Sequence, residues 1–467
     1  MSDLSAQLST LRAAQCAEGP PTRRDRARLL QRLLAELLDR REALCAAVDV
    51  DFGGRSRHET LLAEIFPTAQ AARHALRHLG RWMSPRRIWT GRAFLPAAAR
   101  VTATPAGVVG IVGPWNYPVL LMLSPVIAAI AAGNRVMVKP SEHCPAVAHE
   151  LERLLTAALG SERVTVVQGD ERVGREFSRL PFGHLLFSGS TAVGRAVLAA
   201  AAENLVPVTL ELGGKSPVIL ADDHDVAVAA QRIAAGKLLS AGQTCIAPDY
   251  VLLPAGRTDA FVAAFRAAAQ QMYGSYADNP DYTAVHGDRH LNRLRQLVDE
   301  AREGGAEVIS LAAPDDDCAA AGKLAPCLVL NAPADCGLLH EEIFGPVLPL
   351  VTCPDVAQAM AFVGQRPRPL VVYLFSHDRA CQDQVRQGTT SGALVFNETL
   401  LQKGVEGLPF GGTGESGMGR YHGRAGFETF SVMRSEFHQS KLNLAGWIRP
   451  PYGPRTERLL RWLLIRD

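Results

Sequence analysis

Hydrophobic residues in the N-terminal part of the chain recur at the spacing of one helix face. Leucines there stand three and four residues apart, with Arg and Glu between them: Leu29, Leu30, Leu33, Leu34, Leu37 and Leu38. This period is typical of an amphipathic helix, so residues 4–80 are predicted to be helical. Residues 86–104 lose the period and have the character of extended strands.

From Gly107 onward, short apolar segments alternate with helical ones. The predicted strands are 107–112, 135–138, 163–168, 184–188 and 208–212. The predicted helices lie between them, at 119–132, 145–159, 172–179 and 191–203. A second alternating block runs from Pro217 to about Ser391. Such alternation indicates βαβ units, so the predicted fold class is α/β with two parallel-sheet, Rossmann-like domains.

Composition narrows the class of protein. The chain has 467 residues, 47% of them hydrophobic, and a net charge of +2. This balance excludes a disordered tail and a polybasic nucleic-acid binder, so no nucleic-acid partner is expected. Residues 101–134 carry no charged side chain, a length that raises the question of a membrane span. Pro105, Pro114, Pro118 and Pro125 interrupt the stretch, which favours a buried strand, loop and helix, and no membrane partner is expected.

The cysteines and the N-terminus indicate the compartment. Nine cysteines are scattered along the chain without a CxxC pair, whereas a disulfide scaffold or a zinc site shows paired spacing. The N-terminus has no apolar segment behind a basic start, so no secretory signal is visible. The sequence predicts free thiols in a reducing, cytoplasmic compartment and no metal site.

The strongest candidates for chemistry are the segments LELGGKSP (210–217) and GQTC (242–245). A Cys thiolate attacks carbonyls and a carboxylate activates the water that releases the acyl group, so Cys245 and Glu211 together suit covalent acyl transfer. Taken singly, each has an ordinary structural explanation. Most cysteines are small buried hydrophobes, and a Glu at a strand end is usually solvated. The combination favours catalysis.

Two further segments lie at the ends of apolar strands. In GPWNYP (113–118), the side-chain amide of Asn116 is suited to stabilise a developing oxyanion, or else it caps the following helix. In VKPSE (138–142), Lys139 and Glu142 are suited to hold ribose hydroxyls, or else they belong to a solvated turn.

The segment FSGSTAVG (187–194) passes from a strand through a glycine turn into a helix. Free amides at such a helix N-terminus bind pyrophosphate, here near Gly189, Ser190 and Gly194. The spacing is GxxxxG rather than GxGxxG, so a plain βα turn explains it equally well.

Two later segments combine Glu, Phe and glycine: EEIFGPV (341–347) and LPFGGTGESGMGRYHG (408–423). The density of glycine between residues 404 and 426 is typical of a long functional loop rather than of a core element. Surface loops are the alternative for both segments.

These segments occur together in one order: NYP, KPSE, GSTxxG, ELGGKSP, GQTC, EEIFGP and PFGG. In this combination the chain resembles the NAD(P)-dependent aldehyde dehydrogenase superfamily, from about residue 10 to residue 465. GPWNYP, GQTCIAPDYVL and YHGRAGFETFS are similar to the class 3 group. The closing FHQSKLNLAGWIRPPYGPRTERLL is similar to bacterial coniferyl aldehyde dehydrogenases.

The resemblance implies oxidation of an aldehyde to the carboxylic acid through a cysteine thiohemiacetal and a thioester. In this scheme Cys245 is the nucleophile, and Asn116 with the backbone N–H of Cys245 stabilises the oxyanion. Glu211 activates the water that hydrolyses the thioester. The implied small-molecule substrate is an aromatic aldehyde such as coniferyl aldehyde, or a medium-chain aliphatic aldehyde.

The resemblance also implies NAD as cofactor, with NADP as a second one that relatives accept. By this resemblance, Lys139 and Glu142 would contact the adenosine ribose, and the turn with Gly189, Ser190 and Gly194 would contact the pyrophosphate. Glu342 would contact the nicotinamide ribose, and Phe344 the nicotinamide ring. A carboxylate at Glu142 hydrogen-bonds ribose hydroxyls and repels a 2′-phosphate, so NAD is the expected preference.

Three parts are expected from the resemblance. Residues 1–208 would form the cofactor-binding domain, 209–395 the catalytic domain, and 396–467 a glycine-rich loop followed by a bridging or oligomerisation segment. Residues 86–104 would pair with that last segment. A homodimer is the implied assembly.

Three alternatives stay open. A CoA-acylating dehydrogenase would pass the acyl group to CoA, although thiolysis needs no base such as Glu211. A non-catalytic structural or binding protein of the same fold would be expected to lack Cys245 or Asn116. A thiol hydrolase would use Cys245 on esters without a cofactor.

Overall fold

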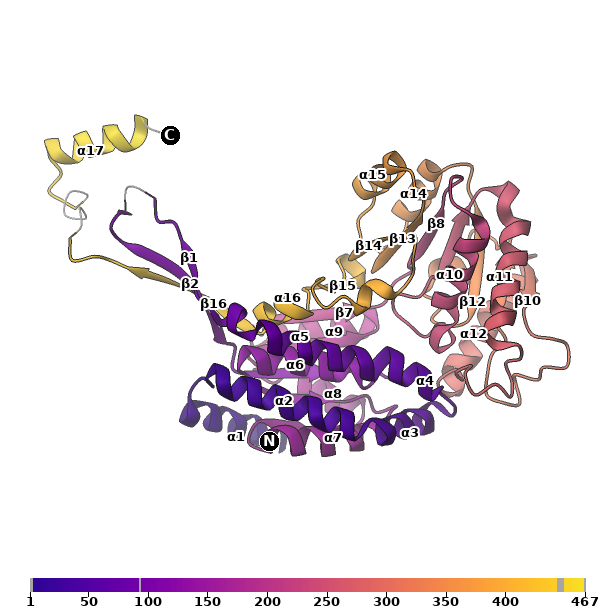
Figure 1. The fold of residues 1–467 in the computed structure, drawn as a ribbon, viewed down its shortest axis with the longest axis horizontal. Helices are drawn as coiled ribbons and strands as arrows, with labels where there is room; N and C mark the ends of the chain where they lie inside the picture. The colour runs from indigo at the N-terminus through magenta and orange to yellow at the C-terminus, as the bar shows by residue number, and fades with distance from the viewer. Residues whose placement is uncertain (1–2, 92–93, 443–448, 466–467) are drawn as a thin grey trace.

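The structure, a computed structural model, describes residues 3–91, 94–442 and 449–465. Two bodies, each built around a sheet, lie side by side, and a narrow arm projects from the first of them (Figure 1). Two largely parallel sheets and a small antiparallel sheet are present, so the predicted α/β class is confirmed.

The N-terminal segment is helical, as the leucine spacing predicts. Its elements are α1 (Asp3–Glu18), α2 (Arg23–Asp39), α3 (Arg41–Phe52), α4 (Arg57–Thr60), the π-helical turn η1 (Leu61–Ile65) and α5 (Phe66–Met83). Helix α2 begins with a capping box, in which the Thr22 hydroxyl accepts from the Asp25 N–H and the Asp25 carboxylate accepts from the Thr22 N–H. Four of its leucines are buried against the body, at positions 29, 30, 33 and 37, and Leu34 and Leu38 are partly buried.

The first body holds a six-stranded sheet in the order β15-β7-β6-β3-β4-β5. Its strands are β3 (Val108–Val112), β4 (Arg135–Lys139), β5 (Val164–Val166), β6 (His184–Gly189), β7 (Val208–Leu212) and β15 (Gly417–Met418). The helices between them are α6 (Leu120–Ala132), α7 (Pro145–Leu159), α8 (Glu171–Ser178) and α9 (Thr191–Ala202). Neighbouring strands are parallel except for β15, which is antiparallel to β7.

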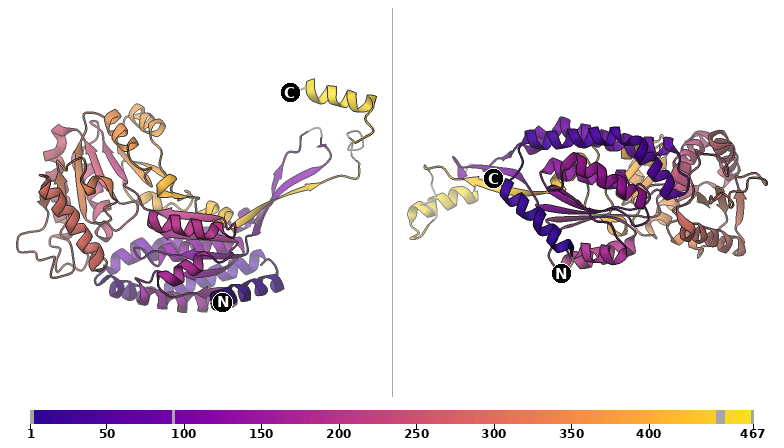
Figure 2. Two further views of the ribbon diagram at one scale, coloured as in Figure 1. Left: turned by 180° about the vertical axis from the view of Figure 1, so that it is seen from behind. Right: turned by 90° about the horizontal axis from the view of Figure 1, so that it is seen from below.

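Helices cover both faces of this sheet (Figure 2). Alternate residues of a strand point to opposite faces, so Val109 and Ile111 of β3 join the core beneath α2, α5, α6 and α7. Val108 joins the core beneath α1, α8 and α9 instead. Helix α6 is buried along its whole length, which explains why residues 101–134 carry no charge. No helix in the described part of the chain is both long enough and apolar enough to cross a bilayer.

The second body holds a seven-stranded sheet in the order β10-β11-β12-β9-β8-β13-β14. Its strands are β8 (Pro217–Leu220), β9 (Tyr250–Leu253), β10 (Glu307–Ser310), β11 (Cys327–Leu330), β12 (Val347–Thr352), β13 (Val371–Phe375) and β14 (Ala393–Phe396). Its helices are α10 (Val226–Leu238), the 3₁₀ turns η3 (Leu239–Gly242) and η4 (Ala255–Arg257), α11 (Thr258–Tyr273), α12 (Gly287–Glu303), α13 (Gly337–His340), α14 (Val356–Gly364) and α15 (Arg379–Gly388). Strand β10 is antiparallel to β11, and the other pairs are parallel.

The glycine-rich segment leads from the second body back to the first. It contains η5 (Leu401–Gly404), η6 (Gly414–Ser416), β15 and α16 (Gly423–Thr429). Because β15 pairs with β7, this segment ties the end of β7 to the region between the two bodies. Strand β7 begins at Val208 and belongs to the first sheet, and the division into 1–208, 209–395 and 396–467 stays a prediction.

The arm is a three-stranded antiparallel sheet of β1 (Arg86–Ile88), β2 (Ala98–Pro105) and β16 (Ser431–His438). Strand β16 pairs with β2 over its full length, so the predicted pairing of residues 86–104 with the C-terminal segment is confirmed. Beyond the arm, α17 (Pro454–Ile465) lies away from both bodies (Figure 1).

Candidate active site

A cleft of about 1340 Å³ lies between the two bodies, at the carboxyl ends of strands β3, β4, β6 and β7. Open α/β sheets bind ligands at this edge. The cleft brings together all the sequence-predicted site residues except Gly194: Asn116, Lys139, Glu142, Gly189, Ser190, Glu211, Cys245, Glu342 and Phe344. Residues far apart in the chain thus share one cavity.

Cys245 reaches the cleft through a turn with unusual backbone geometry. Ser240, Ala241 and Gly242 have φ angles of 53°, 51° and 75°, all in the left-handed region. A Cβ on Gly242 would lie 2.3 Å from the carbonyl oxygen of Gly345, so only glycine fits there. Burial, followed by the charges of Glu342 and Glu211, raises the pKa of the Cys245 thiol to about 12, while Lys403 opposes the shift.

Asn116 follows β3 and faces the cleft with its side chain. The Nδ2 of Asn116 donates to the carbonyl oxygen of Gln243 at 3.1 Å. Since a side-chain amide carries two N–H groups, the other is available to a ligand. Asn116 does not cap α6, because a carboxylate oxygen of Glu64 accepts from the N–H groups of Val119 and Leu120 at 2.7 and 3.1 Å. The oxyanion role of Asn116 stays a prediction.

Glu211 lies in β7 with its carboxyl group buried beside the cleft. Neither carboxylate oxygen has a hydrogen-bond partner within the described residues. Burial raises the pKa of Glu211 well above its ordinary value, although the charges of Lys403 and Arg420 oppose this. A carboxylate whose pKa is raised binds a proton more readily, which suits Glu211 to accept a proton as a general base.

Lys403 is a residue that the motif analysis missed. It lies in η5, and its Nζ contacts the Nε2 of His422. The same Nζ lies 4.8 Å from the ring centroid of Phe410 and 5.6 Å from that of Tyr421. Both rings line the cleft. Burial lowers the pKa of Lys403 to about 8. The scarcity of lysine, with six in the chain, was the only sequence signal for it.

The far end of the cleft suits a dinucleotide. Lys139 is buried, and its Nζ donates to a carboxylate oxygen of Glu142 at 2.9 Å. Burial raises the pKa of the Glu142 carboxyl, but the hydrogen bond from Lys139, a backbone hydrogen bond and the charges of Lys139 and His143 together lower it below its ordinary value. Ser190 caps α9, whose N-terminal amides face the cleft. Gly194 instead packs against β7, where a Cβ would lie 2.6 Å from Leu212 Cδ2.

Glu342 and Phe344 close the cleft from the second body. Glu342 accepts from the Gly214 N–H at 2.9 Å, and burial raises the pKa of its carboxyl to about 7. The Phe344 ring meets the Trp115 ring edge-on, with centroids 5.4 Å apart. In the described ranges, no three His, Cys, Asp or Glu side chains are grouped so as to hold a metal ion.

Comparisons with known proteins identify the relatives of this chain. The model of the aldehyde dehydrogenase family matches residues 8–435. The "Probable coniferyl aldehyde dehydrogenase" of Pseudomonas aeruginosa is 46% identical over 466 residues, which are 100% of this chain and 97% of that protein. The "Coniferyl aldehyde dehydrogenase" of Pseudomonas sp. strain HR199 is 42% identical over 99% of this chain and 97% of its own length.

A solved structure gives the same result for the fold. The "Substrate bound state of Staphylococcus Aureus AldH" superposes with a TM-score of 0.94 at 33% sequence identity. The match covers 99% of this chain and 100% of that one. Both bodies and the arm are therefore shared with it.

Proposed function

This chain belongs to the aldehyde dehydrogenase family, and we propose that it oxidises aromatic aldehydes such as coniferyl aldehyde to the carboxylic acids, with NAD as its preferred cofactor. One observation carries the proposal: Cys245, Asn116 and Glu211 line a single cleft whose other end is suited to a dinucleotide. The names of two relatives, one a "Probable coniferyl aldehyde dehydrogenase" and one a "Coniferyl aldehyde dehydrogenase", support the substrate class.

The first step forms a bond between Cys245 and the aldehyde. The Sγ of Cys245, as the thiolate, attacks the carbonyl carbon, and the carbonyl π electrons move to the oxygen. Asn116 Nδ2 and the backbone N–H of Cys245 donate to that oxyanion. Burial raises the pKa of this thiol above its ordinary value, and the charge of Lys403 opposes that rise. Lys403 therefore favours the reactive thiolate.

The second step releases the acid. Glu342 and Phe344 would hold a nicotinamide ring, which would supply the acceptor for the hydride of the thiohemiacetal carbon and so leave a thioester on Cys245. Glu211 then takes a proton from water as that water attacks the thioester carbonyl. The C–S bond breaks, the carboxylic acid leaves, and Cys245 is restored.

Residues at the far end of the cleft fit the cofactor. The ion pair of Lys139 and Glu142 suits ribose hydroxyls, and the capped N-terminus of α9 at Ser190 suits a pyrophosphate. Glu342 and Phe344 are suited to the nicotinamide ribose and ring. The ionised Glu142 repels a 2′-phosphate, so NAD is preferred over NADP. A tenfold preference for NADP in kcat/KM would contradict this.

Aromatic side chains support an aromatic substrate. Trp115, Phe410 and Tyr421 line the cleft that also contains Cys245. A medium-chain aliphatic aldehyde is the second candidate, since apolar walls accept both. NADH formation measured over coniferyl, benzyl, C6–C12 and shorter aliphatic aldehydes separates the two, and a strong preference for short aliphatic aldehydes would rule out the coniferyl assignment.

Replacement of the nucleophile tests the reaction itself. Cys245→Ala should abolish NAD-dependent aldehyde oxidation, because no thiohemiacetal forms. Cys381→Ala, which changes a partly exposed cysteine of α15, serves as the matched control and should retain activity. Full activity of Cys245→Ala would refute the proposal. Acid formation without CoA distinguishes the enzyme from a CoA-acylating one.

Assembly and location complete the proposal. The arm exposes apolar side chains, and we assign them to the interface of a homodimer. The nine cysteines are all free thiols, which suits the reducing cytoplasm.

A further inference from the structure

We propose that Glu59 is a positioning residue for the nucleophile, because it holds the left-handed turn Ser240–Gly242 from which Cys245 reaches the cleft. Glu59 belongs to α4, in the N-terminal helical layer, and it is not among the residues that line the cleft. The inference deepens the proposed function and rests on Cys245 being the nucleophile.

The turn before Cys245 needs support. Ser240 and Ala241 carry a Cβ yet have φ angles of 53° and 51°, a conformation that L-residues rarely adopt. Such a backbone persists where the surrounding structure fixes it, and it is concentrated at functional sites. Both residues are fully buried, so water cannot satisfy their backbone groups.

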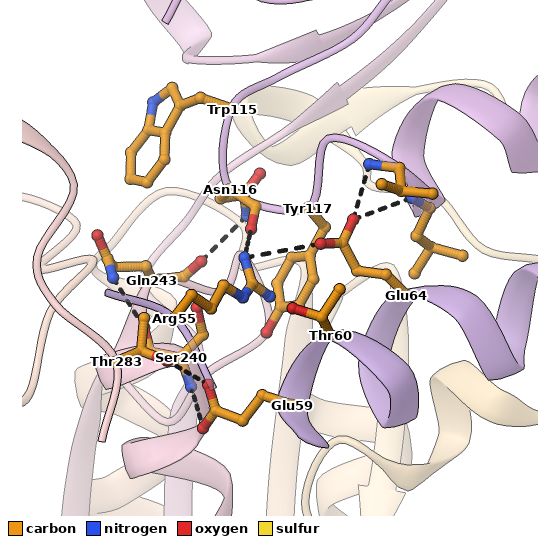
Figure 3. A network of polar contacts seen from close by, with 12 residues as sticks. Arg55, Glu59, Thr60, Glu64, Trp115, Asn116, Tyr117, Ser240, Gln243 and Thr283 are labelled. Carbon is orange, nitrogen blue, oxygen red and sulfur yellow. Dashed lines mark hydrogen bonds and ion pairs between the residues drawn. The ribbon is translucent and has the colours of Figure 1, made fainter. Parts of the chain in front are cut away.

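The Glu59 carboxylate supplies that support with both of its oxygens. One accepts from the Ser240 N–H at 3.0 Å, and the other accepts from the Thr283 hydroxyl at 2.5 Å. Thr283 has no exposed surface and Glu59 is 7% exposed. The Ser240 amide is therefore held by a carboxylate that is itself fixed by a second residue (Figure 3).

Gln243 links the turn to the oxyanion donor. Its Nε2 donates to the carbonyl oxygens of Ser240 and Ala284, both at 2.9 Å, and its Oε1 accepts from the His286 N–H at 2.8 Å. The carbonyl oxygen of Gln243 accepts from Asn116 Nδ2. A displaced turn would therefore also displace the amide that faces the oxyanion.

The segment that contains Glu59 also supplies residues that hold Asn116. Arg55 Nη1 donates to the Asn116 carbonyl oxygen at 2.6 Å, and its guanidinium lies 4.7 Å from the ring centroid of Tyr117. Glu64 lies 3.8 Å from Arg55 and accepts from the first amides of α6. Arg55, Glu59 and Glu64 thus belong to one buried network (Figure 3). The network connects the turn before Cys245 with the segment that carries Asn116.

Substitution of Glu59 separates positioning from folding. Glu59→Ala removes both acceptors, and kcat should fall about 100-fold, because a misplacement of 1 Å can have that effect. KM for NAD should change less than about twofold, since Glu59 does not contact the cofactor end of the cleft. Glu59→Gln keeps an oxygen for the Ser240 N–H and should restore kcat to within about fivefold of the parent.

Two further variants complete the test. Val48→Ala removes buried side-chain volume in the neighbouring α3 and gives a destabilised control whose kcat should be unchanged. Thr283→Val removes the hydroxyl that fixes Glu59 with little change in shape, and kcat should fall about tenfold. It carries the test if Glu59→Ala fails to fold.

The outcomes distinguish this inference from the proposed function. A folded Glu59→Ala with the kcat of the parent refutes the positioning role. An equal loss of kcat in Glu59→Ala, Glu59→Gln and Val48→Ala also refutes it, since that pattern reports stability alone. Activity retained by Cys245→Ala refutes the proposed function, whatever the Glu59 variants show.

Discussion

At the scale of single residues, burial and charge together set the ionisation of the candidate active site. Burial raises the pKa of the Cys245 thiol, the charges of Glu342 and Glu211 add to the rise, and the charge of Lys403 opposes it. Lys403 also opposes the rise in the pKa of Glu211. One buried cation therefore favours the ionised form of both groups that the proposed reaction needs ionised.

Removal of the Lys403 charge should shift the pH dependence of the reaction. In Lys403→Met the pKa values of Cys245 and Glu211 both rise, so a smaller fraction of each is ionised at neutral pH. The acid limb of kcat/KM should move up by about one pH unit, and the rate at pH 7 should fall about tenfold. Steady-state kinetics between pH 6 and 10 measure this, with the exposed Lys441→Met as control. A limb that stays in place, or moves down, contradicts the role.

Glu142 should set cofactor preference. In Glu142→Ala the carboxylate that repels a 2′-phosphate is gone, while the neighbouring Lys139 remains as a cation that attracts it. The ratio of kcat/KM for NADP to that for NAD should rise about tenfold. Glu428→Ala, which breaks a surface ion pair of α16, is the matched control. An unchanged ratio would place the discrimination elsewhere.

At the scale of elements, the loops that follow the parallel strands carry the chemistry, and glycine decides how closely they approach. After β7, Gly213 lies so close to Glu342 that an added Cβ would be 2.0 Å from its Oε2. Glu342 is held there by the Gly214 N–H. A larger residue at this contact between the two bodies would displace the Glu342 carboxyl group.

A methyl group at this contact should weaken cofactor binding. Gly213→Ala forces Glu342 away from its place at the cofactor end of the cleft, so KM for NAD should rise about tenfold. Isothermal titration with NAD checks the same effect on Kd. Gly364→Ala in α14 meets no atom within 4 Å and should leave KM unchanged. Equal KM values in the two variants would show that Glu342 does not need this position.

At the scale of the whole molecule, the arm exposes apolar side chains that the packing of a single protomer does not explain. Its three strands project away from both bodies (Figure 1), and the arm exposes Trp89, directly after β1, at 72% and Phe437 of β16 at 56%. Exposed apolar surface of this kind marks an interface. In the proposed homodimer the partner covers it.

A charge on the arm should therefore separate the protomers. Phe437→Glu places a carboxylate in the proposed interface, where desolvation without a partner is unfavourable. Light scattering should show a dimer for the parent and a monomer for the variant. Val50→Glu, at a position in α3 that is 71% exposed, should remain a dimer. A parent that is a monomer or a stable tetramer would contradict the proposed assembly.

The sequence by itself determined the elements and the types of chemistry. A period of 3.6 marks the buried face of a helix, and a short apolar run marks a strand that is buried on both faces. The N-terminal helices and the strands from Val108 to Leu212 could therefore be predicted from local patterns alone. The motifs likewise identified Cys245, Glu211 and Asn116 as candidates, because their residue types fit one reaction. These are local properties, and local patterns are what a sequence displays.

Only the tertiary structure decided which residues meet and what each one does. Asn116 was compatible with a helix cap until Glu64, from another helix, was seen to satisfy the amides of α6. Gly194 belongs to the predicted phosphate turn, yet it packs against Leu212. Glu59 holds Ser240 across 181 positions of the chain. Such contacts form only when segments that are distant in the sequence fold together, so no local pattern of residues indicates them.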